Sequence, residues 1–170
     1  MKNEKLIVSV YCDKVRSIHN VGSIFRTSEG FGFVEKIYLG GYTPTPNHPK
    51  MQKTALGSEL VIDWETIKQP IRLIKKLKEE GYQIVALEKL NKKNLEKLKA
   101  KNKKLKIYNI YNFIPKNKIL FIVGNEVDGI SKNMLELVDI MVEIPMNGKV
   151  KESLNVSVSF GIGLYSLIKL

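Results

Sequence analysis

Short apolar runs rich in β-branched residues recur along the chain, separated by segments whose apolar residues have helical spacing. The runs predict six strands, at residues 6–11, 36–39, 60–64, 83–87, 119–123 and 140–144. Strands that alternate with helices indicate an α/β fold with a mainly parallel sheet flanked by helices. The run ILFIV at 119–123 is apolar throughout, which is typical of a central parallel strand covered on both faces.

Four helices are predicted between and after these strands. Asn20 is expected to cap the first, and Pro70 suits the first turn of the second, which Gly81 ends. A short third helix is expected at 134–138, and the last occupies the apolar segment 154–170. Two segments are predicted to lack regular structure: residues 42–53, which hold three prolines, and residues 107–114.

Residues 88–106 differ from the rest of the chain because they carry nine lysines against two glutamates. Two structures fit this composition. One is a short helix over 91–105 that packs through Leu95, Leu98 and Leu105, and the other is a mobile surface insertion. No repeat or composition change marks a boundary elsewhere, so we expect a single domain over 1–170 with a lysine-rich insertion at about 89–106.

The last predicted helix is apolar on nearly every side. Leu154, Val158, Tyr165 and Ile168 lie along one side, and Val156, Phe160, Leu164 and Leu167 are displaced from that stripe. A helix of this kind must be covered on several sides. The sequence therefore predicts either a second copy of the chain against it or a central helix of a monomer.

The charge pattern narrows the class of partner. The net charge is +11 and the pI is about 9.6, which favours a polyanionic partner such as nucleic acid over a merely solubilising surface. Cys12 is the sole cysteine, so no internal disulfide is possible and a reducing cytoplasm fits. Serines and Asn155 interrupt the last apolar segment, which is also slightly short for a membrane span. We therefore expect a cytoplasmic protein with no membrane segment.

Three stretches rich in glycine and polar residues follow predicted strands, where open α/β sheets bind ligands. In NVGSIFR at 20–26, Arg26 lies on one helix face with Gly22 and Gly30, which leaves room either for a ligand or for an arginine beside small residues. In VGNEVDGIS at 123–131, Gly124 is expected to let a ligand approach the backbone.

The same stretch contains Glu126, which is placed either to accept hydrogen bonds from a ligand or to cap the next helix. The third stretch ends in Ser153 and Asn155, uncharged hydrogen-bonding residues at the start of the last helix. That stretch is interpreted either as a well-capped helix start or as a ligand loop held against a core helix.

Together and in this order, these stretches resemble the SpoU (TrmH) family of RNA 2′-O-ribose methyltransferases, within the knotted SPOUT superfamily. The matching residues are NVGSIFRTSEGFG at 20–32, ILFIVGNEVDGIS at 119–131 and IPMNGKVKESLNVSVSFGIGLY at 144–165. TPTPNHPKMQKTALGSE at 43–59 also resembles the family. The resemblance covers nearly the whole chain outside the lysine-rich segment.

The resemblance implies a homodimer with a C-terminal trefoil knot and an S-adenosylmethionine cofactor. It places the cofactor against the backbone around Leu87, Gly124, Ile144 and Leu154, with Ser153. It matches Asn20, Arg26, Glu126, Ser153 and Asn155 to the family's functional polar residues. The implied reaction transfers a methyl group to a ribose 2′-OH of tRNA or rRNA. The alternative is a non-catalytic RNA-binding module that retains the fold.

Two roles are possible for Arg26. It acts either as the base that accepts the hydroxyl proton or as a cation that stabilises the developing alkoxide and anchors a phosphate. RNA binding is expected from exposed cations, namely Arg16, Lys50, Lys53, Lys92 and Lys93. No metal is expected, because Cys12, His19 and His48 do not have the spacing of a zinc site.

Overall fold

The computed structural model describes residues 6–150 and 153–168, and its centre is one seven-stranded sheet. The strand order is β3-β2-β1-β6-β4-β7-β5, and every neighbouring pair runs parallel. The strands are β1 (Ile7–Asp13), β2 (Val34–Gly40), β3 (Asp63–Ile67), β4 (Gln83–Leu87), β5 (Lys106–Asn109), β6 (Lys118–Val123) and β7 (Ile140–Glu143). The predicted parallel α/β fold is confirmed.

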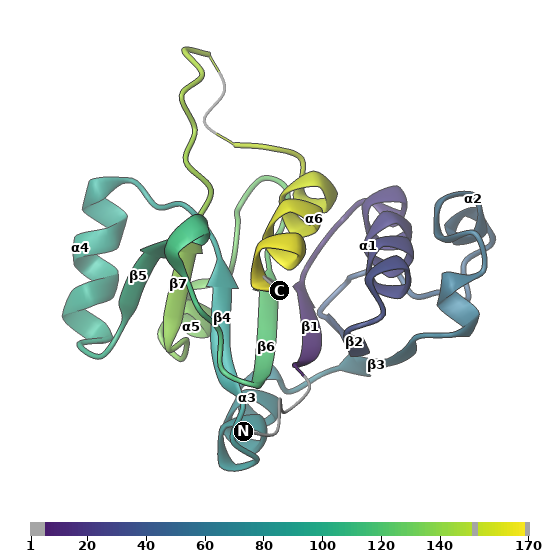
Figure 1. Ribbon diagram of the computed structural model, residues 1–170, viewed down its shortest axis with the longest axis horizontal. Coiled ribbons are helices and arrows are strands. Elements are labelled where there is room, and N and C mark those ends of the chain that lie inside the picture. The colour runs from purple at the N-terminus through teal and green to yellow at the C-terminus, as the bar shows by residue number, and fades with distance from the viewer. Residues whose placement is uncertain (1–5, 151–152, 169–170) are drawn as a thin grey trace.

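Helices cover both faces of the sheet (Figure 1). They are α1 (Ile18–Phe31), α2 (Gln52–Ala55), α3 (Pro70–Glu79), α4 (Lys92–Lys101), α5 (Lys132–Leu135) and α6 (Val156–Leu167), with 3-10 turns η1 (Pro49–Met51), η2 (Ser58–Leu60) and η3 (Ile110–Asn112). α1, α2 and α6 pack on one face, and α3, α4 and α5 pack on the other. Residues 169–170 of the predicted last helix lie outside the described residues.

Strand β6 is buried at the centre of the sheet, as its apolar sequence predicts. Its side chains alternate between the two cores: Phe121 packs with Phe160 of α6 at a ring-centroid distance of 6.1 Å, and Leu120 and Ile122 belong to the core beneath α3 and α5. All five residues from Ile119 to Val123 are buried. Alternation with both faces covered is what a central parallel strand requires.

Two strand predictions were wrong. The apolar residues at 60–62 do not begin a strand, because Gly57 has a φ of 94° and starts the η2 turn, and β3 begins at Asp63. Leu60 and Val61 consequently point into solvent. Residues 107–114, expected to be irregular, contain most of edge strand β5, which pairs with β7, and then η3.

The first helix begins earlier than predicted. Ser17, not Asn20, is the N-cap of α1, because the Ser17 Oγ accepts a hydrogen bond from the Asn20 amide at 3.3 Å. Asn20 lies within the helix, so its side chain is available for another contact. The short helix predicted at 134–138 is α5, which begins and ends earlier, at Lys132 and Leu135.

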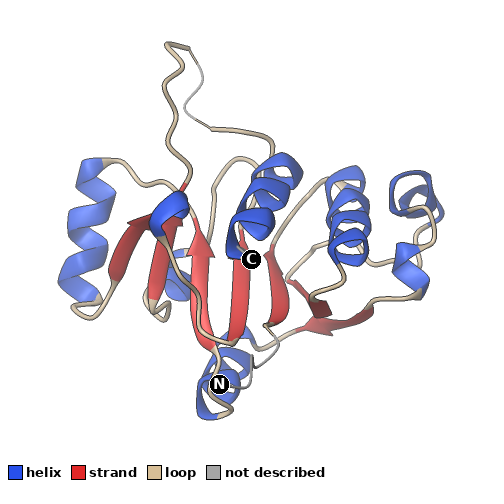
Figure 2. Ribbon diagram, in the orientation of Figure 1, coloured by secondary structure: helices blue, strands red, loops and turns tan. Residues whose placement is uncertain are grey.

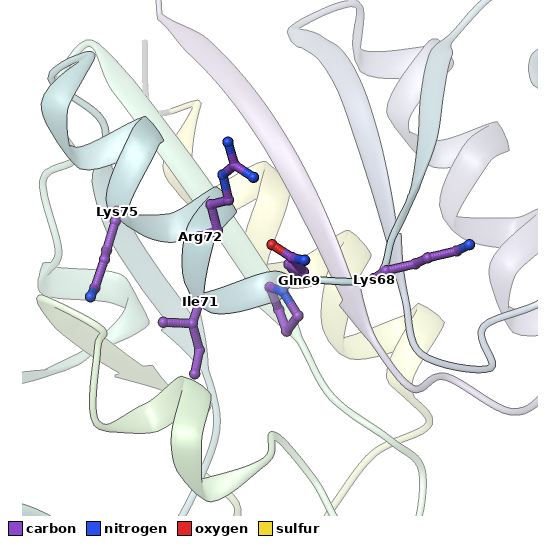
Figure 3. Close-up of a pocket in the computed structure, with 6 residues that line it drawn as sticks. Lys68, Gln69, Ile71, Arg72 and Lys75 are labelled. Atoms are coloured by element: carbon purple, nitrogen blue, oxygen red, sulfur yellow. The ribbon is translucent and has the colours of Figure 1, made fainter.

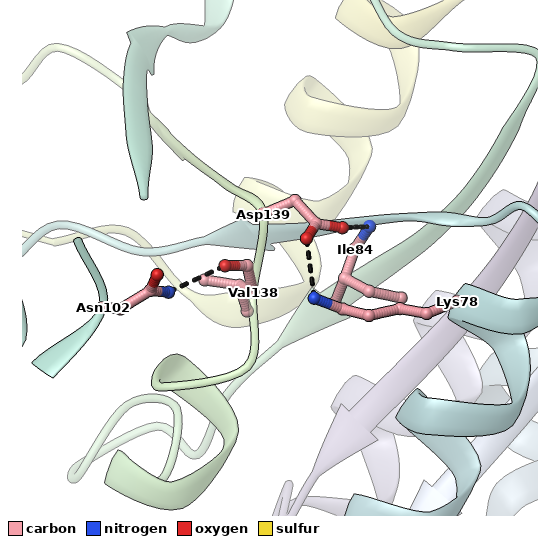
Figure 4. A network of polar contacts seen from close by, with 5 residues as sticks. All are labelled: Lys78, Ile84, Asn102, Val138 and Asp139. Carbon is pink, nitrogen blue, oxygen red and sulfur yellow. Dashed lines mark hydrogen bonds and ion pairs between the residues drawn. The ribbon is translucent and has the colours of Figure 1, made fainter. Parts of the chain in front are cut away.

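The lysine-rich segment forms an ordered helix rather than a mobile insertion. Asn91 caps α4, Leu98 and Leu105 are buried, and Leu95 packs beside them, as the helical interpretation predicted. Asn102 Nδ2 then donates to the carbonyl of Val138 at 2.9 Å. Figure 4 shows this bond next to Asp139, which accepts from the Lys78 Nζ at 2.6 Å and from the Ile84 amide at 2.9 Å. The helix is therefore tied to the start of β7.

Candidate functional site

All seven strands are parallel, so their carboxyl ends lie at one edge of the sheet, and the three polar stretches of the sequence meet there. Residues 144–150, which follow β7, extend beyond this edge, and α6 lies across the front of the sheet (Figure 2). Open parallel sheets bind their ligands at this edge.

Glu126 is the centre of a hydrogen-bond network at the edge. Its carboxylate accepts from the backbone amides of Arg16 (2.8 Å) and Ser17 (2.9 Å) and from Asn20 Nδ2 (2.8 Å). The first two donors lie at the start of α1, which comes more than 100 residues earlier in the chain. Glu126 therefore holds the segment that leads into α1, whose N-cap is Ser17, and the helix that follows Glu126 has its own N-cap at Ser131.

The environment of Glu126 favours its ionised form. Partial burial alone would raise the pKa of this carboxyl, but the hydrogen bonds from Arg16, Ser17 and Asn20 outweigh that effect and lower it. Glu126 thus presents a negative charge that three donors hold in a fixed position.

Asn20 connects this network to α6. Its Oδ1 accepts from Asn155 Nδ2 at 3.0 Å, while its own Nδ2 donates to Glu126. Asn155 Oδ1 caps α6 by accepting from the amides of Ser157 (2.9 Å) and Val158 (3.4 Å). The chain Glu126–Asn20–Asn155 therefore brings together one residue from each of the three polar stretches.

Arg26 and Ser153 lie outside this chain of hydrogen bonds. Arg26 is six residues after Asn20, about 9 Å further along the axis of α1. Its side chain is exposed, and it makes no hydrogen bond or ion pair with the part of the chain that the structure describes. Ser153 is exposed two residues before the Asn155 cap.

Room for a ligand was predicted beside Gly22, Gly30 and Gly124, but the protein's own atoms fill the space next to Gly22 and Gly124. A Cβ at Gly22 would collide with the Thr54 hydroxyl of α2, so this glycine serves helix packing, whereas nothing lies within 4 Å of a Cβ at Gly30. A Cβ at Gly124 would collide with the backbone of Gly129 and Ile130. The close approach that Gly124 permits is therefore made, on the side of its missing Cβ, by the chain's own loop.

Three further polar residues hold the loop after β6, and the sequence analysis missed them. Asn125 and Gly129 exchange two backbone hydrogen bonds of 3.0 Å, and Asn125 Oδ1 accepts from the amides of Val127 and Asp128. Buried Asp13 accepts from the Ser131 amide at 2.7 Å, and Glu88 accepts from the Ile130 amide at 2.8 Å. Glu88 directly follows the predicted strand 83–87, and Asp13 lies two residues after the predicted strand 6–11. Their places at the ends of strands were the signal that could have identified them.

The positions predicted to hold a cofactor are adjacent. Leu87, Gly124 and Ile144 lie at the ends of β4, β6 and β7, which are neighbours in the order β6-β4-β7. Leu87 and Ile144 are half-buried, and Leu154 is 38% exposed. Apolar surface therefore remains uncovered beside the loop backbone.

The cations predicted to bind RNA are all exposed but do not form one cluster. Arg16 precedes α1, and Lys50 and Lys53 lie in η1 and α2, which pack against α1. Lys92 and Lys93 lie in the first turn of α4, and Figure 1 shows α2 and α4 at opposite ends of the molecule.

Neither a metal cluster nor a membrane span is found in the part of the chain that the structure describes. Among the described residues, no three or more His, Cys, Asp or Glu side chains are grouped to hold a metal ion. No helix in residues 6–150 and 153–168 is long and apolar enough to cross a membrane.

Comparison with known proteins identifies the family. Residues 7–165 match the model of the SpoU rRNA Methylase family. The chain belongs to this family. A tRNA (guanosine(18)-2′-O)-methyltransferase of Aquifex aeolicus is 30% identical over 169 residues, which cover 96% of this chain and 69% of that protein. The 23S rRNA (guanosine-2′-O-)-methyltransferase RlmB of Neisseria meningitidis serogroup B is 28% identical, covering 89% of this chain and 54% of its own length.

Solved structures share the fold of this SpoU family chain. The crystal structure of an AdoMet-bound rRNA methyltransferase from Sinorhizobium meliloti superposes with a TM-score of 0.80 at 21% identity, covering 98% of this chain and 57% of that one. The chain thus spans between about half and about two thirds of the length of the proteins that it matches.

Proposed function

We propose that this SpoU family chain is an S-adenosylmethionine-dependent enzyme that methylates a ribose 2′-OH of tRNA or rRNA. The observation that carries the proposal is the Glu126–Asn20–Asn155 network, in which the family's three polar stretches meet at the carboxyl edge. The two curated relatives are guanosine 2′-O-methyltransferases, one named for tRNA and the other for rRNA. The proposal therefore covers both classes of RNA.

We assign the cofactor to the ends of β4, β6 and β7, at Leu87, Gly124 and Ile144, with Ser153 and Leu154 beside them. The uncovered apolar surface there suits an adenine ring, and the loop backbone offers hydrogen-bonding groups. When bound, S-adenosylmethionine supplies an electrophilic methyl group on a positively charged sulfur. The Sinorhizobium meliloti neighbour with AdoMet bound supports this choice.

The protein must hold the ribose hydroxyl in line with the methyl group and stabilise the oxygen as its proton leaves. Orientation alone can lower a barrier by about 7–11 kcal/mol. Glu126, Asn20 and Asn155 fix the starts of α1 and α6 against each other, and we assign them to keeping these two helix starts in place during the reaction. We assign Ser153, which lies next to this network in the chain, to orienting the cofactor or the ribose.

Arg26 acts in this proposal as a cation and not as a base. Arginine retains its proton in proteins. The exposed Arg26 has no acidic partner among the described residues, so its guanidinium is available to a phosphate. It anchors the phosphate next to the target ribose and stabilises the developing alkoxide, while water or that phosphate accepts the proton.

We also infer that the chain acts as a homodimer through α6. Leu154, just before this helix, and Val158 and Tyr165 on it expose 38%, 50% and 70% of their surface, whereas Phe160 and Leu164 on the other side of the helix are fully buried. A stripe of large apolar residues facing water marks an interaction site. A cytoplasmic location, the trefoil knot and a single domain over 1–170 belong to the same proposal.

Transfer of a labelled methyl group from S-adenosylmethionine to total RNA tests the function. The RNA is fractionated by size and the label is mapped to a nucleotide. Label on a ribose 2′-oxygen supports the proposal. Label on protein or small molecules alone would contradict it, and an absence of cofactor binding by calorimetry would favour the non-catalytic RNA-binding alternative.

A further inference from the structure

Lys14, directly after β1, has a backbone conformation that a lysine rarely adopts. Its φ is 57°, in the left-handed region, and among the described residues Leu56 (52°) is the one other non-glycine residue with a positive φ. Two contacts hold this conformation: the Lys14 amide donates to the Gly40 carbonyl at 3.3 Å, and its carbonyl accepts from Asn125 Nδ2 at 2.8 Å. Glycine would fit this backbone with less strain, so the lysine side chain requires a reason of its own.

The Lys14 side chain follows the carboxyl edge from β1 toward β2. A Cβ at Gly41 would lie 2.8 Å from Lys14 Cγ, so the lysine stem crosses directly over this glycine. Lys14 is exposed, and its ammonium group makes no ion pair within the described chain. The arrangement leaves a free positive charge above the edge, beside the network around Glu126.

Further cations continue along the same edge. Gly40 of β2 pairs with Ile67 of β3, so Lys68 follows at the next position. Because neighbouring strands are about 4.8 Å apart, the strand ends Asp13 and Ile67, which directly precede Lys14 and Lys68, lie about 10 Å from each other. Lys68 also borders a hollow of about 540 Å³ at the start of α3, together with Arg72 and Lys75 (Figure 3).

The cations around this hollow have no acidic partners in the described chain, unlike their neighbours on α3. Lys76 pairs with Glu80 and Lys78 pairs with Asp139, whereas Lys68, Arg72 and Lys75 form no ion pair. Unpaired cations that lie along one edge form the electrostatic footprint of a nucleic-acid backbone.

We propose that this edge, from Arg16 through Lys14 to Lys68 and Arg72, binds the sugar–phosphate backbone of RNA next to the target nucleotide. The inference rests on the proposed function and adds the path that the RNA strand takes away from the site. The inner end adjoins the site, because the Arg16 amide donates to Glu126. The RNA strand therefore leaves the site over the ends of β1, β2 and β3.

Replacing Lys14 by glycine separates the side chain from the backbone. Lys14→Gly keeps the left-handed conformation and relieves its strain, so we expect an unchanged or higher Tm. Unfractionated tRNA should bind about fivefold more weakly at 0.1 M salt, and the slope of log K against log[salt] should fall by about 0.7, the value for one lost phosphate contact. Lys14→Arg should retain both the affinity and the slope.

Matched variants control for strain and for charge. Leu56→Gly makes the same backbone change away from this edge and should leave tRNA binding unchanged. Lys68→Gln with Arg72→Gln should weaken binding further than Lys116→Gln with Lys118→Gln, which removes two charges at the amino edge of β6. If Lys14→Gly fails to fold, Lys14→Asn provides the same test, because asparagine tolerates the left-handed region.

The outcomes also separate this inference from the proposed function. A wild-type protein that neither binds tRNA nor methylates total RNA contradicts the function itself. A wild-type protein that does both, with equal affinity and salt slope in Lys14→Gly, overturns the basic edge alone.

Discussion

A single carboxylate organises the residues of the candidate site. Glu126 accepts from two amides at the start of α1 and from Asn20, and it remains partly exposed while doing so. From the sequence, Glu126 was interpreted either as an acceptor for a ligand or as a helix cap. The sequence did not decide between them, because the hydrogen-bond partners of Glu126 lie more than 100 residues away in the chain. Distant partners of this kind are set by the fold and are not visible in local spacing.

Glu126→Gln should lower stability in a pH-dependent way. Its folded-state pKa is lowered, so its contribution is present above the unfolded pKa of about 4.3 and is lost as pH falls through the folded value. We expect a loss of about 1–2 kcal/mol at pH 7, given the partial exposure of the group, and a smaller difference at pH 3. Urea unfolding between pH 3 and pH 7 measures this, and Asp128→Asn in the same loop is the control. If the difference in unfolding free energy between wild type and Glu126→Gln stayed constant from pH 3 to pH 7, the lowered pKa of Glu126 would be contradicted.

Glu88→Gln should show the opposite pH dependence. Burial raises the pKa of Glu88, and hydrogen bonds from the amides of Ile130 and Lys89 offset that effect only in part. The contribution of this group is therefore present below the unfolded pKa and is lost as pH rises through the folded value. In the same unfolding series, wild type should lose stability relative to Glu88→Gln as pH rises above about 4.3. A wild type that gained stability relative to the variant would show that the hydrogen bonds outweigh burial.

Arg26→Lys tests whether the planar fork of the guanidinium is needed. Lysine keeps the charge but cannot bind a phosphate through two parallel hydrogen bonds. We expect Arg26→Lys to lower kcat by about 10- to 100-fold, and Arg26→Ala by about 100- to 1000-fold, which is the range for the loss of one oxyanion donor. Single-turnover methyl transfer to RNA measures both variants. Near-full activity of Arg26→Lys would exclude any role that depends on the fork.

Helix α6 shows what an apolar pattern can predict about an element. The sequence separates two stripes on this helix, and the structure buries one while leaving most of the other in solvent: Phe160, Leu164 and Leu167 are buried, and Leu154, Val158 and Tyr165 are exposed. The pattern predicts which residues belong together. It does not reveal which stripe faces the sheet, because that depends on the partners of the helix.

Val158→Glu should disrupt the proposed dimer. The side chain is 50% exposed in the isolated chain, so a glutamate is tolerated in the monomer but would be buried without a partner in a dimer. Sedimentation velocity should show a dimer for wild type and a monomer for the variant, with both chains folded. Leu60→Glu, at an exposed apolar residue of η2, is the control and should remain dimeric. A monomeric wild type would contradict the homodimer.

At the scale of the molecule, the sequence predicted the layers better than the connections. The apolar run at 119–123 identified the central strand, whereas Leu95, Leu98 and Leu105 offered a helix in the lysine-rich segment as one of two alternatives. The errors at residues 60–64 and 107–114 arose because short apolar runs are compatible with turns and because edge strands are less apolar.

The candidate site, like the fold, was predicted only in part from the sequence. Asn20, Glu126 and Asn155 were predicted from motif resemblance, and the structure places them in one network. The strained backbone of Lys14 and the carboxylates of Asp13 and Glu88 were missed. Each takes its role from a loop that reaches it through the fold, so the sequence gives only its position after a strand and not its partner.

The central position of β6 has a consequence for how the protein is made. β6 lies between β1 and β4, and Ile7 pairs with Lys118, so the middle of the sheet cannot close until the ribosome has synthesised more than 100 residues beyond β1. Pairings this distant in sequence fold slowly. Until β6 arrives, the apolar strand β1 has an unpaired edge of the kind that promotes aggregation. Nascent chains that end between β1 and β6 should therefore be the stage at which this protein depends most on chaperones.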